Sequence, residues 1–195
     1  QFVGDFLTFT PLAFITFEPS TENQTMKKTL LLFVLGFSFF NGIAQTEWKR
    51  TSIDEIVSVE IPGEPEKKDE QNVLSYSFRS KDSAAYAVNV IDFSKFGMDS
   101  ATLQAMVTQE MFLEQFKAGM TQQLPGAEIK EAKIITVGNY TAYDIVIEAD
   151  KNGKKILTYS LNIFVGSKDY SFVYASSETS APESKERFFK SIEIK

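Results

Sequence analysis

The sequence predicts an α+β fold, in which a mainly antiparallel β-sheet of about six to eight strands is covered by one long helix and a short C-terminal helix. Three observations predict this class. Runs with an apolar residue at every second position, typical of half-buried strands, dominate the chain after Gln45. Connections of hairpin length join many of these runs, and antiparallel strands allow such short links. One long stretch, residues 101–124, repeats its apolar residues at helical spacing, so it can cover the apolar face of the sheet.

Three strands are expected before that helix. Residues 57–61 alternate apolar and polar side chains, and Pro62 with Gly63 ends the run. The stretch 64–72, EPEKKDEQN, is expected to be a polar loop. Strands over 74–78 and 86–93 follow, and residues 81–83 turn the chain between them.

The long helix has clear boundary signals. Asp99 or Ser100 can cap its start by accepting hydrogen bonds from free backbone N–H groups, and Pro125 with Gly126 ends it. Five residues fall in one apolar stripe at 3.6 residues per turn: Met106, Leu113, Phe116, Met120 and Leu124.

Four further strands are expected over 129–137, 140–149, 156–165 and 170–174. Asn152 and Gly153 are a strong hairpin signal between the second and third of these, because both residues tolerate positive φ. Ser180 and Glu183 match a capping box that begins a short helix through Phe189. Residues 191–194 complete the expected sheet as an edge strand.

Residues 26–44, MKKTLLLFVLGFSFFNGIA, match an export signal. Lys27 and Lys28 form its positive start, an apolar stretch follows, and small residues precede a cleavage site between Ala44 and Gln45. About a dozen apolar residues are too few to span some 30 Å of hydrocarbon stably, so cleavage is favoured over an uncleaved anchor. We therefore expect a secreted product, periplasmic or extracellular, with no stable membrane anchor after cleavage.

Residues 1–25 do not fit this signal, because a second initiation-like Met-Lys-Lys follows them. We interpret this segment as read-through upstream of the true start. The alternative is a genuine extension, which would make residues 26–44 an internal anchor. Residues 45–195 are then expected to form a single secreted α+β domain.

The composition excludes several kinds of chemistry. The chain has no cysteine, which excludes disulfides, thiolate nucleophiles and cysteine-ligated metals. It has no histidine, which excludes the Ser-His-Asp triad and histidine-ligated zinc or haem. A formal net charge of −6 without a long basic run disfavours nucleic acid as a partner. We expect no cofactor and no metal site.

The chain resembles the PsbP-like family in two segments. Residues 57–66 carry a strand that ends in Pro-Gly, and residues 188–194 carry a phenylalanine-bearing helix that leads into a short strand. The order of the expected elements extends the likeness over most of residues 45–195. The resemblance implies an antiparallel sheet flanked by helices and a non-catalytic role, which in photosynthetic members is that of an extrinsic subunit docked on a larger complex. It transfers no partner and no binding residue.

Two acidic motifs each have a functional and a structural interpretation. Asp150, Asn152 and Gly153 look like a fragment of a calcium loop, but lysines replace the next oxygen ligands, and a hairpin turn explains all three. Glu110 and Glu114 lie one helical turn apart, a spacing that can grip a cation or pair catalytic carboxylates. Like charges on a solvated helix face are the more common explanation.

Other candidate residues are weaker. The nearest match to a Ser-x-x-Lys dyad has Arg187 three residues after Ser184, and arginine cannot serve as the base. Asn139 begins a glycosylation-like triplet that also fits a simple turn. Aromatic residues could line a ligand groove, although on alternating strands they are more often core residues: Trp48 and the tyrosines at 76, 86, 140, 143, 159, 170 and 174.

The functional expectation is a secreted, non-enzymatic binding or accessory protein whose partner is a protein or a small ligand in the cell envelope. Two alternatives remain open. One is a carboxylate-based hydrolase acting on glycan or peptidoglycan, which requires two converging carboxylates. The other is a structural or chaperone-like envelope module, which requires an exposed apolar patch.

Overall fold

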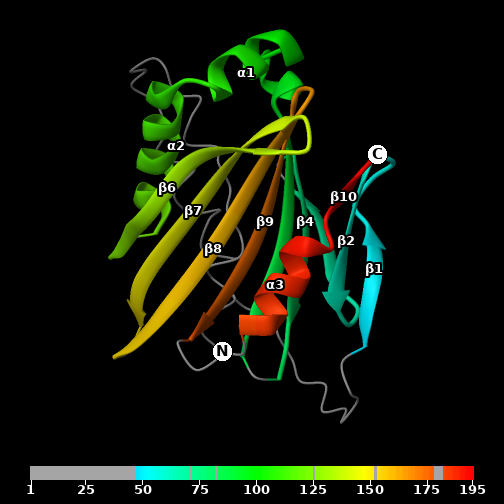
Figure 1. The fold of residues 1–195 in the computed structure, drawn as a ribbon, viewed down its shortest axis with the longest axis vertical. Coiled ribbons are helices and arrows are strands. Elements are labelled where there is room, and N and C mark those ends of the chain that lie inside the picture. The colour runs from blue at the N-terminus through cyan, green and yellow to red at the C-terminus, as the bar shows by residue number, and fades with distance from the viewer. Residues whose placement is uncertain (1–46, 71, 82, 125, 152, 178–181) are drawn as a thin grey trace.

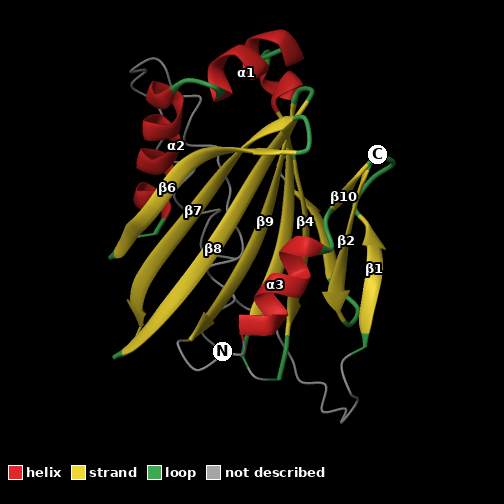
Figure 2. Ribbon diagram, in the orientation of Figure 1, coloured by secondary structure: helices red, strands yellow, loops and turns green. Residues whose placement is uncertain are grey.

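The computed structural model describes residues 47–195 apart from 71, 82, 125, 152 and 178–181. A seven-stranded sheet, a three-stranded sheet and three α-helices make up this part of the chain, which confirms the predicted α+β class (Figures 1 and 2). The signal segment and its cleavage site at Ala44 and Gln45 lie outside the described residues.

The large sheet is antiparallel throughout. Its strands lie in the order β3 (Glu66–Glu70), β4 (Val73–Arg79), β5 (Ala85–Asp92), β9 (Lys168–Ser177), β8 (Lys154–Val165), β7 (Tyr140–Lys151) and β6 (Ala127–Val137). The helical segment between β5 and β6 carries the chain to the far edge of the sheet. The strands then return one by one as a meander until β9 pairs with β5.

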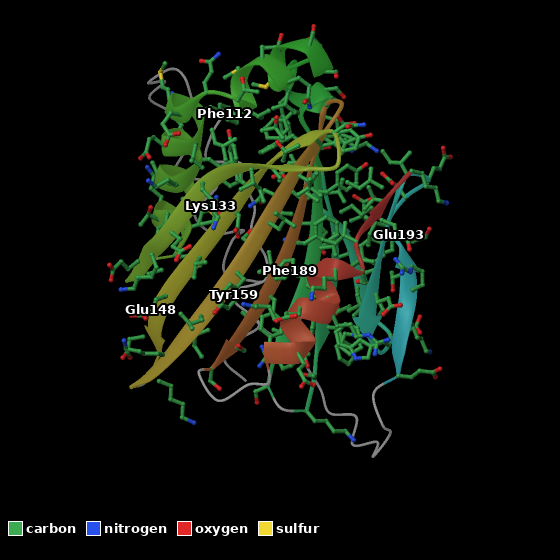
Figure 3. All side chains as sticks on the ribbon, in the orientation of Figure 1. Phe112, Lys133, Glu148, Tyr159, Phe189 and Glu193 are labelled. Atoms are coloured by element: carbon green, nitrogen blue, oxygen red, sulfur yellow. The ribbon has the colours of Figure 1, made fainter. Side chains whose placement is uncertain are left out.

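One face of this sheet is covered by the small sheet and by α3 (Pro182–Lys190), which lies in front of the strands in Figure 1. The small sheet contains β1 (Trp48–Ser52), β2 (Val57–Pro62) and β10 (Glu193–Ile194), with β2 in the middle. Phe188 of α3 is fully buried against Tyr86 and Phe172 of the large sheet. Figure 3 labels Tyr159 and Phe189, which pack at the margin of the same cluster.

The opposite face carries the remaining helices: the 3-10 helix η4 (Phe93–Phe96), α1 (Ser100–Val107) and α2 (Glu110–Gln123). Figure 1 shows α2 beside β6. Phe116 of α2 meets the ring of Tyr143 edge-on at 5.4 Å, and Tyr143 meets Phe164 at 4.8 Å. The helices therefore cover the β6–β7 side of this face.

The expectation of one unbroken helix over 101–124 is wrong. The helix stops at Val107 and a second one begins at Glu110. The side chains of Thr108 and Gln109 both donate hydrogen bonds to the carbonyl of Ala105, at 3.1 and 3.0 Å. In an uninterrupted helix the Ala105 carbonyl would accept a hydrogen bond from a backbone N–H group, and here side chains donate to it instead. The apolar stripe continues across the break.

The expectation of a polar loop over 64–72 is also wrong, because β3 occupies Glu66–Glu70. This strand is at the edge of the sheet and its five residues, EKKDE, are all charged. The strand forms because it pairs with β4, and its charged residues show no apolar alternation that would reveal it in the sequence. Charges on an edge strand also deter pairing between molecules. The strand β1, also at an edge, was not predicted for a similar reason.

The other expected elements are confirmed with small changes in their ends. Gly153 has φ of 74° in the β7–β8 connection, as the hairpin signal required. Residues 193–194 form the expected final strand, although it pairs with β2 of the small sheet and not with the large one. Ser180 of the expected capping box lies outside the described residues.

Candidate functional site

The helices cover the β6–β7 side of their face of the large sheet, and the rest of that face carries polar side chains. Four neighbouring strands place six neutral polar side chains on it, which we call the polar floor: Ser75 of β4, Asn89 of β5, Ser171 of β9, and Thr158, Ser160 and Asn162 of β8. The strand register aligns Ser75, Asn89, Ser171 and Asn162 in one row across the sheet. All six except Ser75 are buried.

Period-two alternation explains why these side chains share a face. In β9 the aromatic residues Tyr170, Phe172 and Tyr174 point toward α3 and the small sheet. The intervening Ser171 and Val173 therefore lie on the opposite face, which carries the polar floor. The same sequence that fills one core with rings thus leaves short side chains on the other face.

The apolar residues between the polar ones are small and form a cluster of their own. Within the described part of the chain, this cluster draws only on strands of the large sheet: Ala85 and Ala87 of β5, Ile156 of β8, and Val173 and Ala175 of β9. The neighbouring core under α1 and α2 contains Tyr143, Ile145 and Phe164 instead. The side chains of the floor are therefore shorter than those of the neighbouring core.

Two hydrogen bonds organise the floor. The hydroxyl of Ser75 donates to Asn89 Oδ1 at 2.8 Å, and Asn162 Nδ2 donates to Ser160 Oγ at 2.9 Å. Thr158 Oγ1 is buried and has no hydrogen-bond partner within the described part of the chain. Since most buried polar atoms in proteins are paired, Thr158 marks a place where a donor or an acceptor is missing.

Asp169 stands at one end of the floor, two residues before Ser171 on β9. Its side chain is 1% exposed, and neither carboxylate oxygen has a hydrogen-bond partner among the described residues. Burial raises the pKa of Asp169 to about 8, because removing a carboxylate from water disfavours its charged form. Across the sheet its neighbours are Ile91 and Phe164, which belong to the core under the helices.

A second polar cluster, on the loop between β1 and β2, is structural. Asp54 accepts hydrogen bonds from the hydroxyl of Tyr170 at 2.6 Å, from Lys168 Nζ at 3.1 Å, and from the backbone N–H groups of Ile56 and Val57. Burial alone would raise the pKa of Asp54, but these hydrogen bonds together lower it below the ordinary 3.8. Oδ2 of this carboxylate therefore fastens the loop to β9, and Oδ1 holds the loop to the start of β2.

The candidate acidic sites of the sequence do not form. The backbone N–H of Gly153 donates to Asp150 Oδ1 at 3.0 Å, so the carboxylate belongs to the hairpin turn; Asn152 lies outside the described residues. Glu114 is paired with Lys117 at 2.7 Å on the exposed side of α2, and Glu110 is also exposed. Within the described ranges, no group of three or more acidic side chains could hold a metal ion.

The remaining candidates are structural as well. Arg187 forms an ion pair with Glu60 at 3.0 Å and lies over the ring of Trp48, so it is not part of a dyad with Ser184. Asn139 lies in the turn between β6 and β7. The aromatic residues are mainly core, as the alternative interpretation held, and four of the tyrosines are almost fully buried: Tyr86, Tyr143, Tyr170 and Tyr174.

The sequence analysis missed the polar floor. Its signal was present, since Ser160 and Asn162 alternate with apolar residues in the run 156–165, and Asn89 does so in 86–93. Such residues normally face water on a half-buried strand. A single strand cannot reveal that its polar side is buried, because that depends on what packs there.

No family model matches this chain, and no curated protein does. Solved structures give distant matches of fold. Cyanobacterial PsbP from Synechocystis is 14% identical with a TM-score of 0.48, over 81% of this chain and 98% of that one. LpqN of Mycobacterium tuberculosis, described as involved in cell envelope biogenesis, is 12% identical with a TM-score of 0.41, over 76% and 90%.

A protein from Bacteroides thetaiotaomicron is 10% identical with a TM-score of 0.46, over 78% of this chain. The match spans about half of that protein, 49% of its length. The likeness is one of fold alone. The expected PsbP-like resemblance therefore stands as a distant similarity of structure, and no family membership follows from it.

All of the described helices are too short or too polar to cross a bilayer.

Proposed function

We propose that this chain is an exported, non-catalytic binding protein whose small ligand lies on the polar floor. The observation that carries the proposal is the burial of neutral polar side chains over three adjacent strands of one sheet face, β5, β9 and β8. Five of them are buried: Asn89, Thr158, Ser160, Asn162 and Ser171. Buried hydroxyls and amides destabilise a protein unless they form hydrogen bonds, so a sheet face meant only for packing would carry valine or isoleucine here.

The chemistry of the floor suits an uncharged, partly apolar surface of a ligand. Small-molecule sites are typically apolar with a few placed polar groups, and the floor joins Ala85, Ala87 and Val173 to the hydroxyl and amide groups around them. No side chain of the floor carries a formal charge, so an ionic ligand would find a counter-charge only at its margin.

Binding is favoured over the two alternative functions. A carboxylate-based hydrolase needs two converging acids, and Asp169 is the one buried carboxylate in the described part of the chain. A chaperone-like module needs an exposed apolar patch. Met111 is the single large hydrophobic side chain that is exposed among the residues the structure describes, so such a patch has no support there.

Export is part of the proposal and rests on the signal-like residues 26–44. Fractionation of cells that express the full chain, followed by N-terminal sequencing of the product, tests it. The expected product begins at Gln45 and is recovered outside the cytosol. An intact chain in the cytosolic fraction would contradict export.

The binding site is tested with a neutral fluorescent probe, N-phenyl-1-naphthylamine, and the protein purified after expression of the full chain. We expect saturable binding that Ser171→Leu abolishes, because a larger, apolar side chain replaces a hydroxyl in the middle of the proposed site. Thr136→Leu makes a similar change at an exposed position of β6 and should leave the affinity unchanged. Binding that is unsaturable, or equal in both variants, would contradict the floor as the site.

A further inference from the structure

Two buried side chains in the described part of the chain contain oxygen atoms without a hydrogen-bond partner, and both lie on the same face of the sheet. They are Asp169, with both carboxylate oxygens, and Thr158, with its hydroxyl. Both side chains point away from α3, because successive side chains of a strand point to opposite faces. Asp169 precedes Tyr170 and Thr158 precedes Tyr159, and both tyrosines pack on the α3 side. Unsatisfied groups are rare, so their coincidence on one face points to one occupant.

Asp169 lies at the boundary between the two halves of this face. Its neighbours across the sheet, Ile91 and Phe164, belong to the core under α1 and α2. Its neighbour along β9 on the same face is Ser171, in the polar floor. Ser171 is thus the floor residue nearest to Asp169 along β9, and Ile91 and Phe164 flank the carboxylate across the sheet.

Among the residues that the structure describes, none gives this carboxylate a positive partner. The lysine next to it in sequence, Lys168, is paired with Asp54 at 3.1 Å. Tyr143, whose pKa is raised by burial and then by Asp169, uses its hydroxyl to donate to the Val107 carbonyl at 2.9 Å. A carboxylate accepts hydrogen bonds from donors, and the strongest such bonds come from cationic groups.

We propose that Asp169 anchors an amine-bearing ligand, by accepting hydrogen bonds from a primary ammonium group of the molecule that lies on the polar floor. This inference rests on the proposed function and names the chemical class of its ligand. The apolar body of the ligand lies over Ala87, Val173 and Ala175, toward Thr158, which pairs with Ala175 on the next strand. Asp169 and Ala175 are six positions apart on β9, a span of about 20 Å in an extended strand, so the ligand is elongated.

The test uses three probes with the same apolar chain and different heads: octylamine, octanol and octanoate. Their binding is measured by isothermal titration calorimetry with the protein purified after expression of the full chain. Above pH 8, where Asp169 is ionised, we expect octylamine to bind at least about tenfold more tightly than octanol, and octanoate to bind least, because a second carboxylate would face Asp169. Asp169→Asn should remove the preference for the amine over the alcohol.

Two further variants keep the result interpretable. Asp169→Ser removes the carboxylate without adding bulk and should give the same loss of preference if the asparagine variant folds poorly. Glu131→Gln removes an exposed acid on β6 and should leave the preference unchanged, which separates a local contact from a general effect of net charge.

The outcomes distinguish the two proposals. If octylamine and octanol bind equally well and Ser171→Leu blocks both, the floor is a binding site and the role of Asp169 is wrong. If octylamine keeps its preference in both Asp169 variants, the anchor is also wrong. If none of the three probes binds, the proposed function fails together with the inference.

Discussion

The hydroxyl of Tyr143, on β7, donates a hydrogen bond of 2.9 Å to the carbonyl of Val107, the last residue of α1. The tyrosine is fully buried, and its ring also packs against Phe116 of α2. One side chain of the sheet thus supports both helices on either side of the break between them. The final carbonyls of a helix have no partner inside it, so the phenol stabilises the end of α1.

We expect Tyr143→Phe to lower the free energy of unfolding by about 1–2 kcal/mol, because the Val107 carbonyl loses its buried partner. Tyr140→Phe removes a hydroxyl from a half-exposed position on the same strand and should change stability by less than about 0.5 kcal/mol. Urea unfolding followed by circular dichroism measures both. Equal effects would show that the hydrogen bond to Val107 contributes nothing specific.

The burial of Asp169 predicts a stability that falls as the pH rises. Its pKa is about 8 in the folded protein and near 3.8 when unfolded, so between these values the folded state holds a proton that the unfolded state has lost. The contribution of Asp169 to the free energy of unfolding is therefore fully present below about pH 4. It declines by at most about 1.4 kcal/mol per pH unit as the pH rises toward 8.

Asp169→Asn should flatten this dependence and make the domain more stable than the unmutated protein at pH 8. Thermal unfolding between pH 5 and pH 8 measures the slope for both proteins. The titratable phenol near Asp169 is Tyr143, whose pKa burial raises further from this range, so it does not contribute. A slope that the substitution leaves intact would place the titration elsewhere.

Asp54 should behave in the opposite way, because its hydrogen bonds lower its pKa despite burial. Its contribution is present above the unfolded pKa of 3.8 and is lost as the pH falls below that value. Asp54→Ala should cost about 2–3 kcal/mol, since it leaves the buried hydroxyl of Tyr170 and two backbone N–H groups without their acceptor.

Lys168→Met is the matched comparison for Asp54→Ala, because it removes a partly exposed partner of the same carboxylate. It should cost no more than about 1 kcal/mol. Chemical denaturation at pH 7 compares the two variants. If the lysine variant were the more damaging, the ion pair and not the loop hydrogen bonds would hold β1–β2 against β9.

The backbone at Gly63 leaves no room for a methyl group. Its φ is 115°, and a Cβ atom there would lie 2.5 Å from Cε2 of Phe78. We expect Gly63→Ala to cost about 2 kcal/mol or more, from backbone strain and from displacement of the ring. Gly138→Ala, with φ of 59° and open space around it, should cost about 1 kcal/mol. Thermal unfolding of the two variants tests the difference.

Much of the fold was predictable because apolar side chains recur with the period of the element that buries them. The alternation in 57–61 predicted β2, and the stripe in 101–124 predicted helical structure that exists as the two helices α1 and α2. The two elements that were predicted wrongly also have physical explanations. β3 is charged along its whole length, so nothing local distinguishes it from a loop, and the helix break at Thr108 depends on side-chain bonds to the Ala105 carbonyl.

The sequence by itself determined the absence of thiol and imidazole chemistry, the α+β class, and the alternation that turns rings to one face of β9 and short side chains to the other. Those properties follow from composition and from the geometry of one strand at a time. Only the tertiary structure decided that Asn89, Ser171 and Asn162 form one row, and that Asp169 is buried beside them without a partner. Register and burial join residues more than seventy positions apart, and no local pattern carries that information.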